Sequence, residues 1–179
     1  MMIEPSGYSG DLEEQVVLPN HRLLRIRPCR CWDSDTVREL YSRLSSRTRY
    51  RRFLCSMPVL PDPVLKALTC ADDRRCFALL AELEQPAGAN AVALGNLGAI
   101  DAGTAELAVV VRDDYQRQGI GTALASKLLQ AGEVRGFKRF VAHVLWENSF
   151  VIRRLLNRAD AVVCSTTSYG VSDLSFVRR

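Results

Sequence analysis

The stretch Ala105–Leu129, AELAVVVRDDYQRQGIGTALASKLL, decides the fold, because it changes from strand to helix periodicity within one unbroken run. Ala108–Val111 is a short apolar run rich in β-branched side chains, which favours a buried strand. Polar residues 112–114 end this run, and from Leu124 onward apolar side chains recur at helical spacing. We therefore predict a strand, a turn and a helix that begins on or near Gly119.

The turn between this strand and this helix, Gln116–Gly121 (QRQGIG), contains two glycines. A helix N-terminus carries unpaired N–H groups and a partial positive charge, and glycines let a diphosphate approach the backbone. Each exposed group contributes roughly 0.3 to 1 kcal/mol from the dipole, so several together make a specific anchor. The alternative is that the glycines only end a strand and start a helix. Neither the dinucleotide fingerprint G-x-G-x-x-G nor the P-loop G-x-x-x-x-G-K-[ST] occurs here.

The flanking sequence predicts further strands and helices on both sides of the central stretch. Residues 1–20 lack periodicity and are expected to be a flexible N-terminal extension, and residues 21–179 to form a single domain. We predict strands at 22–27, 76–83, 91–97, 138–145, 162–166 and 171–177, and helices at 33–44, 64–69 and 150–158. The order is a hairpin-rich first half followed by a strand, helix, strand second half.

Composition limits the function classes only loosely. A chain of 179 residues with 47% hydrophobic content is enough for one domain, and the net charge of +4 suits an anionic ligand as well as nucleic acid. The six cysteines form no C-x-x-C pair, so we expect no metal site and interpret them as reduced thiols, mostly in the core. No signal-peptide pattern and no apolar run of ~20 residues occurs, so a cytoplasmic protein without a membrane partner is expected.

The central motif resembles that of a known family. A strand followed by Q/R-x-x-G-x-G/A and a helix is similar to the acyl-CoA-binding motif of the GNAT superfamily of N-acetyltransferases, with Gln116, Gly119 and Gly121 at its fixed positions. The segments RIRP, LSSRTRYRRF and VLKALTCADD also resemble the GNAT domain of bacterial protein lysine acetyltransferases. The resemblance implies an α/β fold with a mixed, mostly antiparallel central sheet, a splayed parallel strand pair and flanking helices. It also implies acetyl-CoA as co-substrate and a single GNAT domain over residues 21–179.

The resemblance also implies which residues bind acetyl-CoA. Val109 and Val111 would expose backbone groups to the pantetheine amides and the thioester carbonyl, and Asn148 would reach the pantetheine or cap the following helix, two compatible roles. At Ala159-Asp160 the chain departs from the family, in which Gly-Phe usually closes that helix. The loop residues expected around the pyrophosphate are Gln116, Arg117, Gln118, Gly119, Gly121 and Thr122.

Amide formation requires a neutral amine. Deprotonating a lysine at pH 7 costs about 4.6 kcal/mol and an α-amine near pKa 8 only about 1.4 kcal/mol, so a lysine acceptor needs a base more. Glu106 is the candidate, since it lies on the strand face shared by Ala108 and Val110, and A-E-Φ-A carries the base in many relatives. It must be buried or act through water to accept a proton near neutral pH. The alternative is an ordinary carboxylate on a strand.

No protein nucleophile is needed if the amine attacks directly in a ternary complex. The general acid that returns a proton to the CoA thiolate stays unassigned, because residues 150–158 lack the tyrosine that many relatives use. His143, which alternates with Ala142 and Val144, is interpreted as a core or edge histidine rather than a catalytic one.

Three functions remain open at this point. The favoured one is an acetyl-CoA-dependent N-acetyltransferase acting on a protein lysine or a small amine. The second is an acyl-CoA-binding regulatory module without transferase activity. The third is a basic nucleic-acid-binding protein that uses the arginines of residues 43–52, although this run better suits a solvated helix face, or recognition of an acidic substrate surface or nucleotide phosphate. Nucleic acid is not the expected partner, and the oligomeric state is open, with a homodimer as one option.

Overall fold

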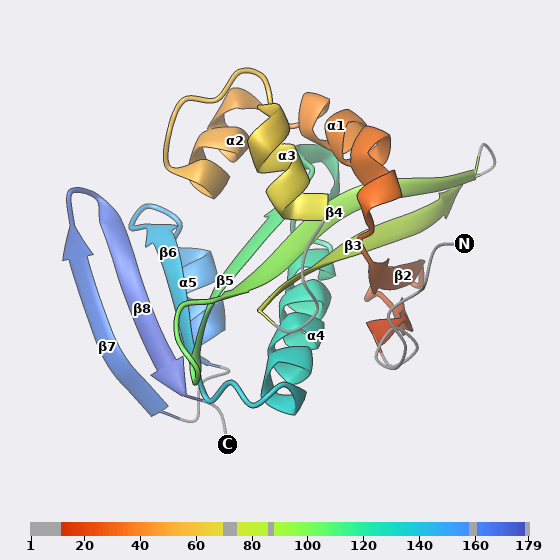
Figure 1. Ribbon diagram of the computed structural model, residues 1–179. Coiled ribbons are helices and arrows are strands. Elements are labelled where there is room, and N and C mark those ends of the chain that lie inside the picture. The colour runs from red at the N-terminus through yellow and green to blue at the C-terminus, as the bar shows by residue number, and fades with distance from the viewer. Residues whose placement is uncertain (1–11, 70–74, 86–87, 158–160, 178–179) are drawn as a thin grey trace.

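The computed structural model describes residues 12–69, 75–85, 88–157 and 161–177. Three helices separate the first two strands from the rest of the sheet, and a fourth connects two neighbouring parallel strands (Figure 1). The elements in chain order are β1 (Glu14–Val17), β2 (Leu23–Pro28), α1 (Ser34–Ser42), α2 (Ser46–Phe53), α3 (Asp62–Thr69), β3 (Cys76–Gln85), β4 (Gly88–Ala99), β5 (Thr104–Val111), α4 (Ile120–Val134), β6 (Arg139–Leu145), α5 (Ser149–Leu156), β7 (Ala161–Ser168) and β8 (Val171–Val177).

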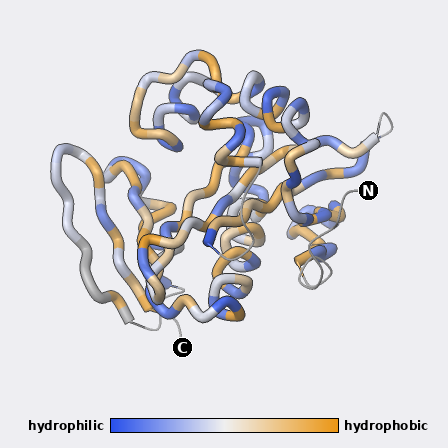
Figure 2. The backbone as a smooth tube through the Cα atoms, viewed as in Figure 1, coloured by the Kyte–Doolittle hydropathy of each residue, from blue (hydrophilic) through white to orange (hydrophobic). Residues whose placement is uncertain are grey.

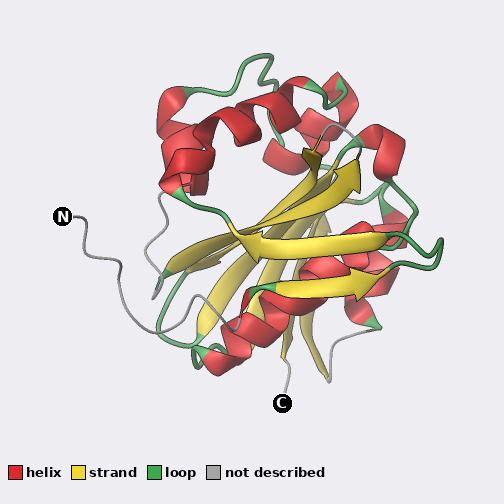
Figure 3. Ribbon diagram, turned by 90° about the vertical axis from the view of Figure 1, so that its right-hand side faces the viewer, coloured by secondary structure: helices red, strands yellow, loops and turns green. Residues whose placement is uncertain are grey.

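Eight strands form one sheet in the order β1-β2-β3-β4-β5-β6-β8-β7. Each neighbouring pair of these strands is antiparallel except β5 and β6, which run parallel because α4 carries the chain across between them. Helices α1, α2 and α3 cover one face and α4 covers the other, as the side view shows (Figure 3). The predicted mixed, mostly antiparallel sheet with flanking helices is confirmed.

The parallel ladder between β5 and β6 is short. It contains the register pairs Thr104↔Arg139, Ala105↔Phe140 and Glu106↔Val141 and no further ones, whereas β4 stays paired with β5 as far as Val111. Beyond Glu106, one edge of β5 therefore has no neighbouring strand among residues 75–85, 88–157 and 161–177. This is the splayed parallel pair that the resemblance implied.

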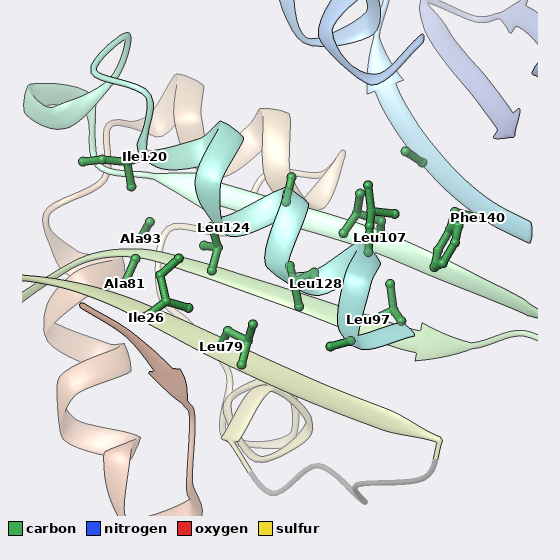
Figure 4. Packing of buried hydrophobic residues seen from close by; sticks show 14 of the residues in the cluster. Ile26, Leu79, Ala81, Ala93, Leu97, Leu107, Ile120, Leu124, Leu128 and Phe140 are labelled. Carbon is green, nitrogen blue, oxygen red and sulfur yellow. The ribbon is translucent and has the colours of Figure 1, made fainter. Parts of the chain in front are cut away.

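Helix α4 packs closely on the sheet through Leu124, Leu128 and Leu129, which are completely buried (Figure 4). Each such side chain contributes roughly 1.5–3 kcal/mol when fully buried. A Cβ at Gly95 would lie 2.6 Å from Leu128, and one at Gly132 would lie 2.8 Å from Leu97, so these glycines permit the close approach. Apolar residues follow the central strands, whereas hydrophilic ones cover much of α1 and α2 (Figure 2).

The N-terminal segment for which an extension was expected carries an edge strand. β1 pairs antiparallel with β2, and the flanking Leu12 and Leu18 are buried. Four residues are too short to show a periodicity, so the sequence did not reveal this strand. Residues 1–11 and the Ala159-Asp160 corner lie outside the described ranges.

The four cysteines whose burial the structure describes are less buried than expected, and Cys70 lies outside the described residues. Cys29 is buried, but Cys31 and Cys55 are exposed and Cys76 is half-buried, so the interpretation of mostly core thiols is wrong for Cys31 and Cys55. Cys31 begins a three-residue 3-10 helix (Cys31–Asp33) and Cys55 follows α2, so no extended period assigns either side chain to the core. In the part of the chain that the structure describes, no helix is long and apolar enough to cross a membrane.

A buried ion-pair network joins β2, β3 and the start of α1. The Arg27 guanidinium donates two hydrogen bonds of 2.9 Å to Asp33 and bonds of 3.0 and 2.7 Å to Glu82. Burial alone would raise the pKa of Asp33, but the hydrogen bonds from Arg27 and from the Arg30 backbone outweigh it and hold this pKa below its usual value. The network therefore stabilises the fold only while Arg27 is present.

We expect Arg27→Ala to lower the free energy of unfolding by about 3–5 kcal/mol at pH 7, because two carboxylates would stay buried without their cation. Urea unfolding followed by circular dichroism measures this loss. Arg25→Ala on the same strand is the control: its partner is Glu13 and both side chains are nearly half exposed, so it should cost less than about 1 kcal/mol.

The loss in free energy of unfolding caused by Arg27→Ala should change with pH in a defined direction. The pKa of Asp33 is lowered on folding, so its stabilisation is present above the unfolded value of about 3.9 and is lost as the pH falls through the folded value. The difference in free energy of unfolding between wild type and Arg27→Ala should therefore become smaller in acid. Equal losses for the Arg27 and Arg25 variants at pH 7 would contradict the assignment.

Candidate active site

Helix α4 begins with its first backbone N–H groups uncapped. Gly119 occupies the N-cap with φ 91°, a left-handed conformation that glycine adopts easily, and no side chain from the described ranges caps the helix. Gly119, Gly121 and Thr122 all line the cavity in front of this helix end. Because three N–H groups at a helix start lack intrahelical partners and carry partial positive charge, the site favours a phosphate group.

Close packing around the turn also favours glycine at both positions. A Cβ at Gly121 would lie 3.2 Å from Val111 Cγ2, and one at Gly119 would lie 3.2 Å from Pro19 Cδ. Gly121 thus lets the helix start sit against the end of β5, and Gly119 lets the N-terminal segment pass behind the loop. The structural and the anion-binding interpretations of these glycines are therefore compatible.

A cavity of about 400 Å³ opens where β5 and β6 part. It is bounded by the unpaired edge of β5, the far half of β6, the turn before α4, and residues of α2 and α5. The expected cofactor-binding residues on its wall are Val109, Val111, Gln116, Arg117, Gly119, Gly121, Thr122 and Asn148.

Gln118 is the expected cofactor residue that does not line this cavity. Its Nε2 donates to the Asp114 carbonyl at 3.1 Å, and its Oε1 accepts from Asn20 Nδ2 at 3.1 Å. The side chain is therefore bonded to neighbouring protein groups and helps to attach the N-terminal segment to the loop.

Two of the lining residues also hold the local backbone. Gln116 Nε2 donates to the Val111 carbonyl at 3.0 Å, so the motif glutamine fixes the end of β5. Asn148 stands at the start of α5, where its carbonyl accepts the Val151 N–H at 2.9 Å. The capping position of Asn148 and its place on the cavity wall are both observed.

Asp113 ties the start of α2 to the end of β5. Its carboxylate accepts hydrogen bonds from the Ser45 N–H at 2.9 Å and from the Ser45 and Thr48 hydroxyls at 2.7 Å each. Burial would raise the pKa of Asp113, but these hydrogen bonds outweigh it and lower the pKa. This role could not be predicted from the sequence, where Asp113 is only one of the polar residues that end the strand.

The arginine run of residues 43–52 is largely engaged within the protein. Arg47 and Arg51 both donate to Glu147 Oε1, at 3.3 and 3.2 Å, and this pairing lowers the pKa of Glu147. Arg43 pairs with Glu39, and Arg49 donates to backbone carbonyls of residues 42 and 58. The run is therefore not a free basic surface, and Arg51 and Arg52 instead contribute to the cavity wall.

Glu106 lies in a smaller pocket of about 180 Å³ that shares Arg52, Ala108 and His143 with the larger cavity. Its side chain is exposed, so burial does not prepare it as a base. Arg52 stands close by: burial lowers the pKa of Arg52 to about 10, and Glu106 acts in the opposite direction. Proton transfer to Glu106 must therefore pass through water or wait until an acceptor covers the pocket.

A sheet opened between two parallel strands, with an uncapped helix at the end of the opening, defines an acyltransferase that binds an acyl thioester of CoA. Residues 37–154 match the family model of the acetyltransferase (GNAT) family, and the chain belongs to that family. The chain is therefore an acetyltransferase of the GNAT family.

Individual relatives agree with this assignment. Acetyltransferase PA5475 of Pseudomonas aeruginosa is 29% identical over 123 residues, which are 68% of this chain and 66% of that protein. The GNAT domain of S. lividans PAT superposes with a TM-score of 0.84 at 26% identity, over 96% of this chain and 100% of that domain. The Salmonella typhimurium protein yncA, solved with acetyl-CoA, has a TM-score of 0.68 at 17% identity, over 86% of this chain and 93% of that one.

A shorter match covers part of a longer protein. Acetyltransferase Pat of Mycolicibacterium smegmatis is 41% identical over 58 residues, which are 32% of this chain but only 17% of Pat. Among the residues that the structure describes, no group of three or more His, Cys, Asp or Glu side chains could hold a metal ion.

We expect Gly119→Ala to weaken acetyl-CoA binding and to lower the free energy of unfolding by about 1–2 kcal/mol, because alanine is strained at this φ. Calorimetric titration with acetyl-CoA and urea unfolding measure the two effects. Gly98→Ala is the control, since a Cβ there meets nothing within 4 Å and its φ is not positive. Equal effects of both substitutions on binding would show that the loop conformation is not required.

Proposed function

We propose that this acetyltransferase transfers the acetyl group to a primary amine by direct attack in a ternary complex. One observation carries the proposal: the Glu106 carboxylate lies in a pocket that joins the larger cavity at Ala108 and His143. An amine entering this pocket would meet a proton acceptor on one side and the opening between β5 and β6 on the other.

The residues present fit acetyl-CoA. The uncapped α4 N-terminus and Arg117 provide positive charge for the pyrophosphate, and the unpaired edge of β5 provides backbone groups for the pantetheine amides. When bound, acetyl-CoA supplies an activated acyl group. A backbone N–H near Val109 can stabilise the negative charge that develops on the acyl oxygen.

Glu106 would accept the proton that the amine loses. A lysine acceptor requires about 4.6 kcal/mol to lose its proton at pH 7, which makes a base necessary rather than optional. Because Glu106 is exposed, we expect a bridging water molecule between its carboxylate and the amine.

The wall of the smaller pocket favours a lysine-like acceptor. Phe53, Leu54 and Leu107 provide apolar surface for an aliphatic stem, and Glu106 provides negative charge for the cationic amine before it loses its proton. The similarity to the GNAT domain of S. lividans PAT also supports a protein acceptor, while a small amine remains the alternative substrate.

Glu106→Gln should lower kcat for acetyl transfer by about 10²–10⁴-fold and leave the Kd of acetyl-CoA unchanged, because the amide cannot accept a proton. Labelled acetyl-CoA with a panel of lysine peptides, N-terminal amines and small amines measures the transfer. Glu84→Gln, at another exposed strand carboxylate, is the matched control and should keep full activity.

The outcomes separate the alternatives. Binding of acetyl-CoA with no transfer to any acceptor would favour a regulatory module. Full activity in Glu106→Gln would exclude Glu106 as the base but retain the enzyme assignment.

A further inference from the structure

His143 stands at the point where the two pockets meet. It lies on β6, two residues beyond Val141, the last residue of the parallel ladder, at the level of Ala108 on β5. It lines both the larger cavity and the pocket of Glu106. A group at this position faces the opening between β5 and β6 from the β6 side.

Asp173 orients the imidazole of His143. The two residues are direct partners in the β6–β8 register, and His143 Nδ1 lies 2.6 Å from Asp173 Oδ1. Because an ionised carboxylate only accepts hydrogen bonds, Nδ1–H is the donor. Among the described ranges no group bonds Nε2, and the side chain is 39% exposed, so Nε2 is available to a ligand.

Few other groups on the cavity wall can release a proton near neutral pH. The hydroxyls of Thr48 and Thr122 and the guanidiniums of Arg51, Arg52 and Arg117 do not do so. Tyr115 OH accepts a hydrogen bond from Gln85 Nε2 at 2.8 Å and is near the loop end of the cavity. Helix α5 contributes Phe150 and Val151, and Asn148 stands just before it; none of these three side chains releases a proton near neutral pH. An imidazole is the side chain best suited to this task.

We propose that His143 is the general acid of the reaction and that Asp173 is its positioning residue. The amine nitrogen forms a bond to the acyl carbon, which becomes the amide. As the carbon–sulfur bond breaks, the electron pair stays on sulfur and His143 Nε2 gives its proton to that sulfur. The products are the free thiol and a neutral imidazole that still donates Nδ1–H to Asp173. The amine proton leaves through Glu106 to solvent, and solvent restores the proton on Nε2. This assignment rests on the proposed acetyl transfer.

Charged groups of both signs face the His143 imidazole. Asp173 on β8 and Glu106 on β5 present negative charge to it, and Arg51 and Arg52 on α2 present positive charge. Glu147 in turn accepts a hydrogen bond from Arg51.

A first experiment needs no acceptor. The thiolate absorbance of CoA bound to the protein is titrated with pH in wild type, His143→Asn and His21→Asn, where His21 is the other, exposed histidine of the chain. An imidazolium beside the sulfur stabilises the thiolate, so the bound thiol should ionise on the order of one pH unit lower in wild type and His21→Asn than in His143→Asn.

A second experiment measures turnover. We expect His143→Asn to lower kcat by about 10²-fold and to change the KM of acetyl-CoA by less than about threefold, because the loss falls on the chemical step. In wild type, kcat should fall at alkaline pH as the acid form is lost. This limb should be absent in His143→Asn and should move to lower pH in Asp173→Asn, whereas His21→Asn should match wild type.

The two experiments together test whether His143 is the general acid. If wild type acetylates an amine and His143→Asn keeps kcat within about twofold, His143 is not the general acid, whatever the thiol titration shows. If wild type acetylates nothing, the proposed function fails, and the thiol titration alone decides whether His143 lies against the sulfur. An unchanged thiol titration in His143→Asn overturns the placement in that case.

Discussion

The early end of the β5–β6 ladder is the constraint on which the rest of the structure depends. Backbone groups buried without partners cost about 1–3 kcal/mol each, so a sheet that opens in its middle must expose them to solvent or to a ligand. The cavity beyond Glu106 provides that exposure. The parallel order also requires a crossover helix, and α4 can lie close enough to the sheet only because Gly95 and Gly132 lack side chains at the contact. The opening in the sheet and the position of the α4 N-terminus beside it are therefore both consequences of one topology.

Helix α2 connects the two strand ends that the opening separates. Asp113 holds its N-terminal end at β5 through three short hydrogen bonds, while Glu147 holds its outer face beside β6 through two longer ion pairs. Arg47 and Glu147 are exposed, so salt screens the second attachment more than the first. Separating α2 from Glu147 should therefore cost less free energy than separating it from Asp113. Two arginines of the run, Arg47 and Arg51, thus attach α2 across the opening.

The sequence predicted the elements that depend on period and spacing. The strand, turn and helix of Ala105–Leu129 were found because alternating and helical patterns meet there, and α4 begins at Ile120, next to the predicted Gly119. The edge strand β1 was not found, since four residues carry no usable period. The part of the site that a single motif forms, the glycine turn, could be predicted from the sequence. Asp113, Arg51 and His143 reach the cavity from separate elements, and only the sheet order brings them together.

The two ends of the site differ in charge and polarity, which matters for the proposed reaction. The overall charge of +4 is too small to steer either of them strongly, so selection must be local. At the loop end, Arg117 and the uncapped start of α4 present positive charge, which suits the phosphates of CoA. At the other end, the smaller pocket holds charges of both signs, Glu106 and Arg52, beside the apolar side chain of Phe53, which suits the aliphatic stem of an amine. Because the two ends meet at His143, the proposed reaction would bring the thioester and the amine together there from opposite sides.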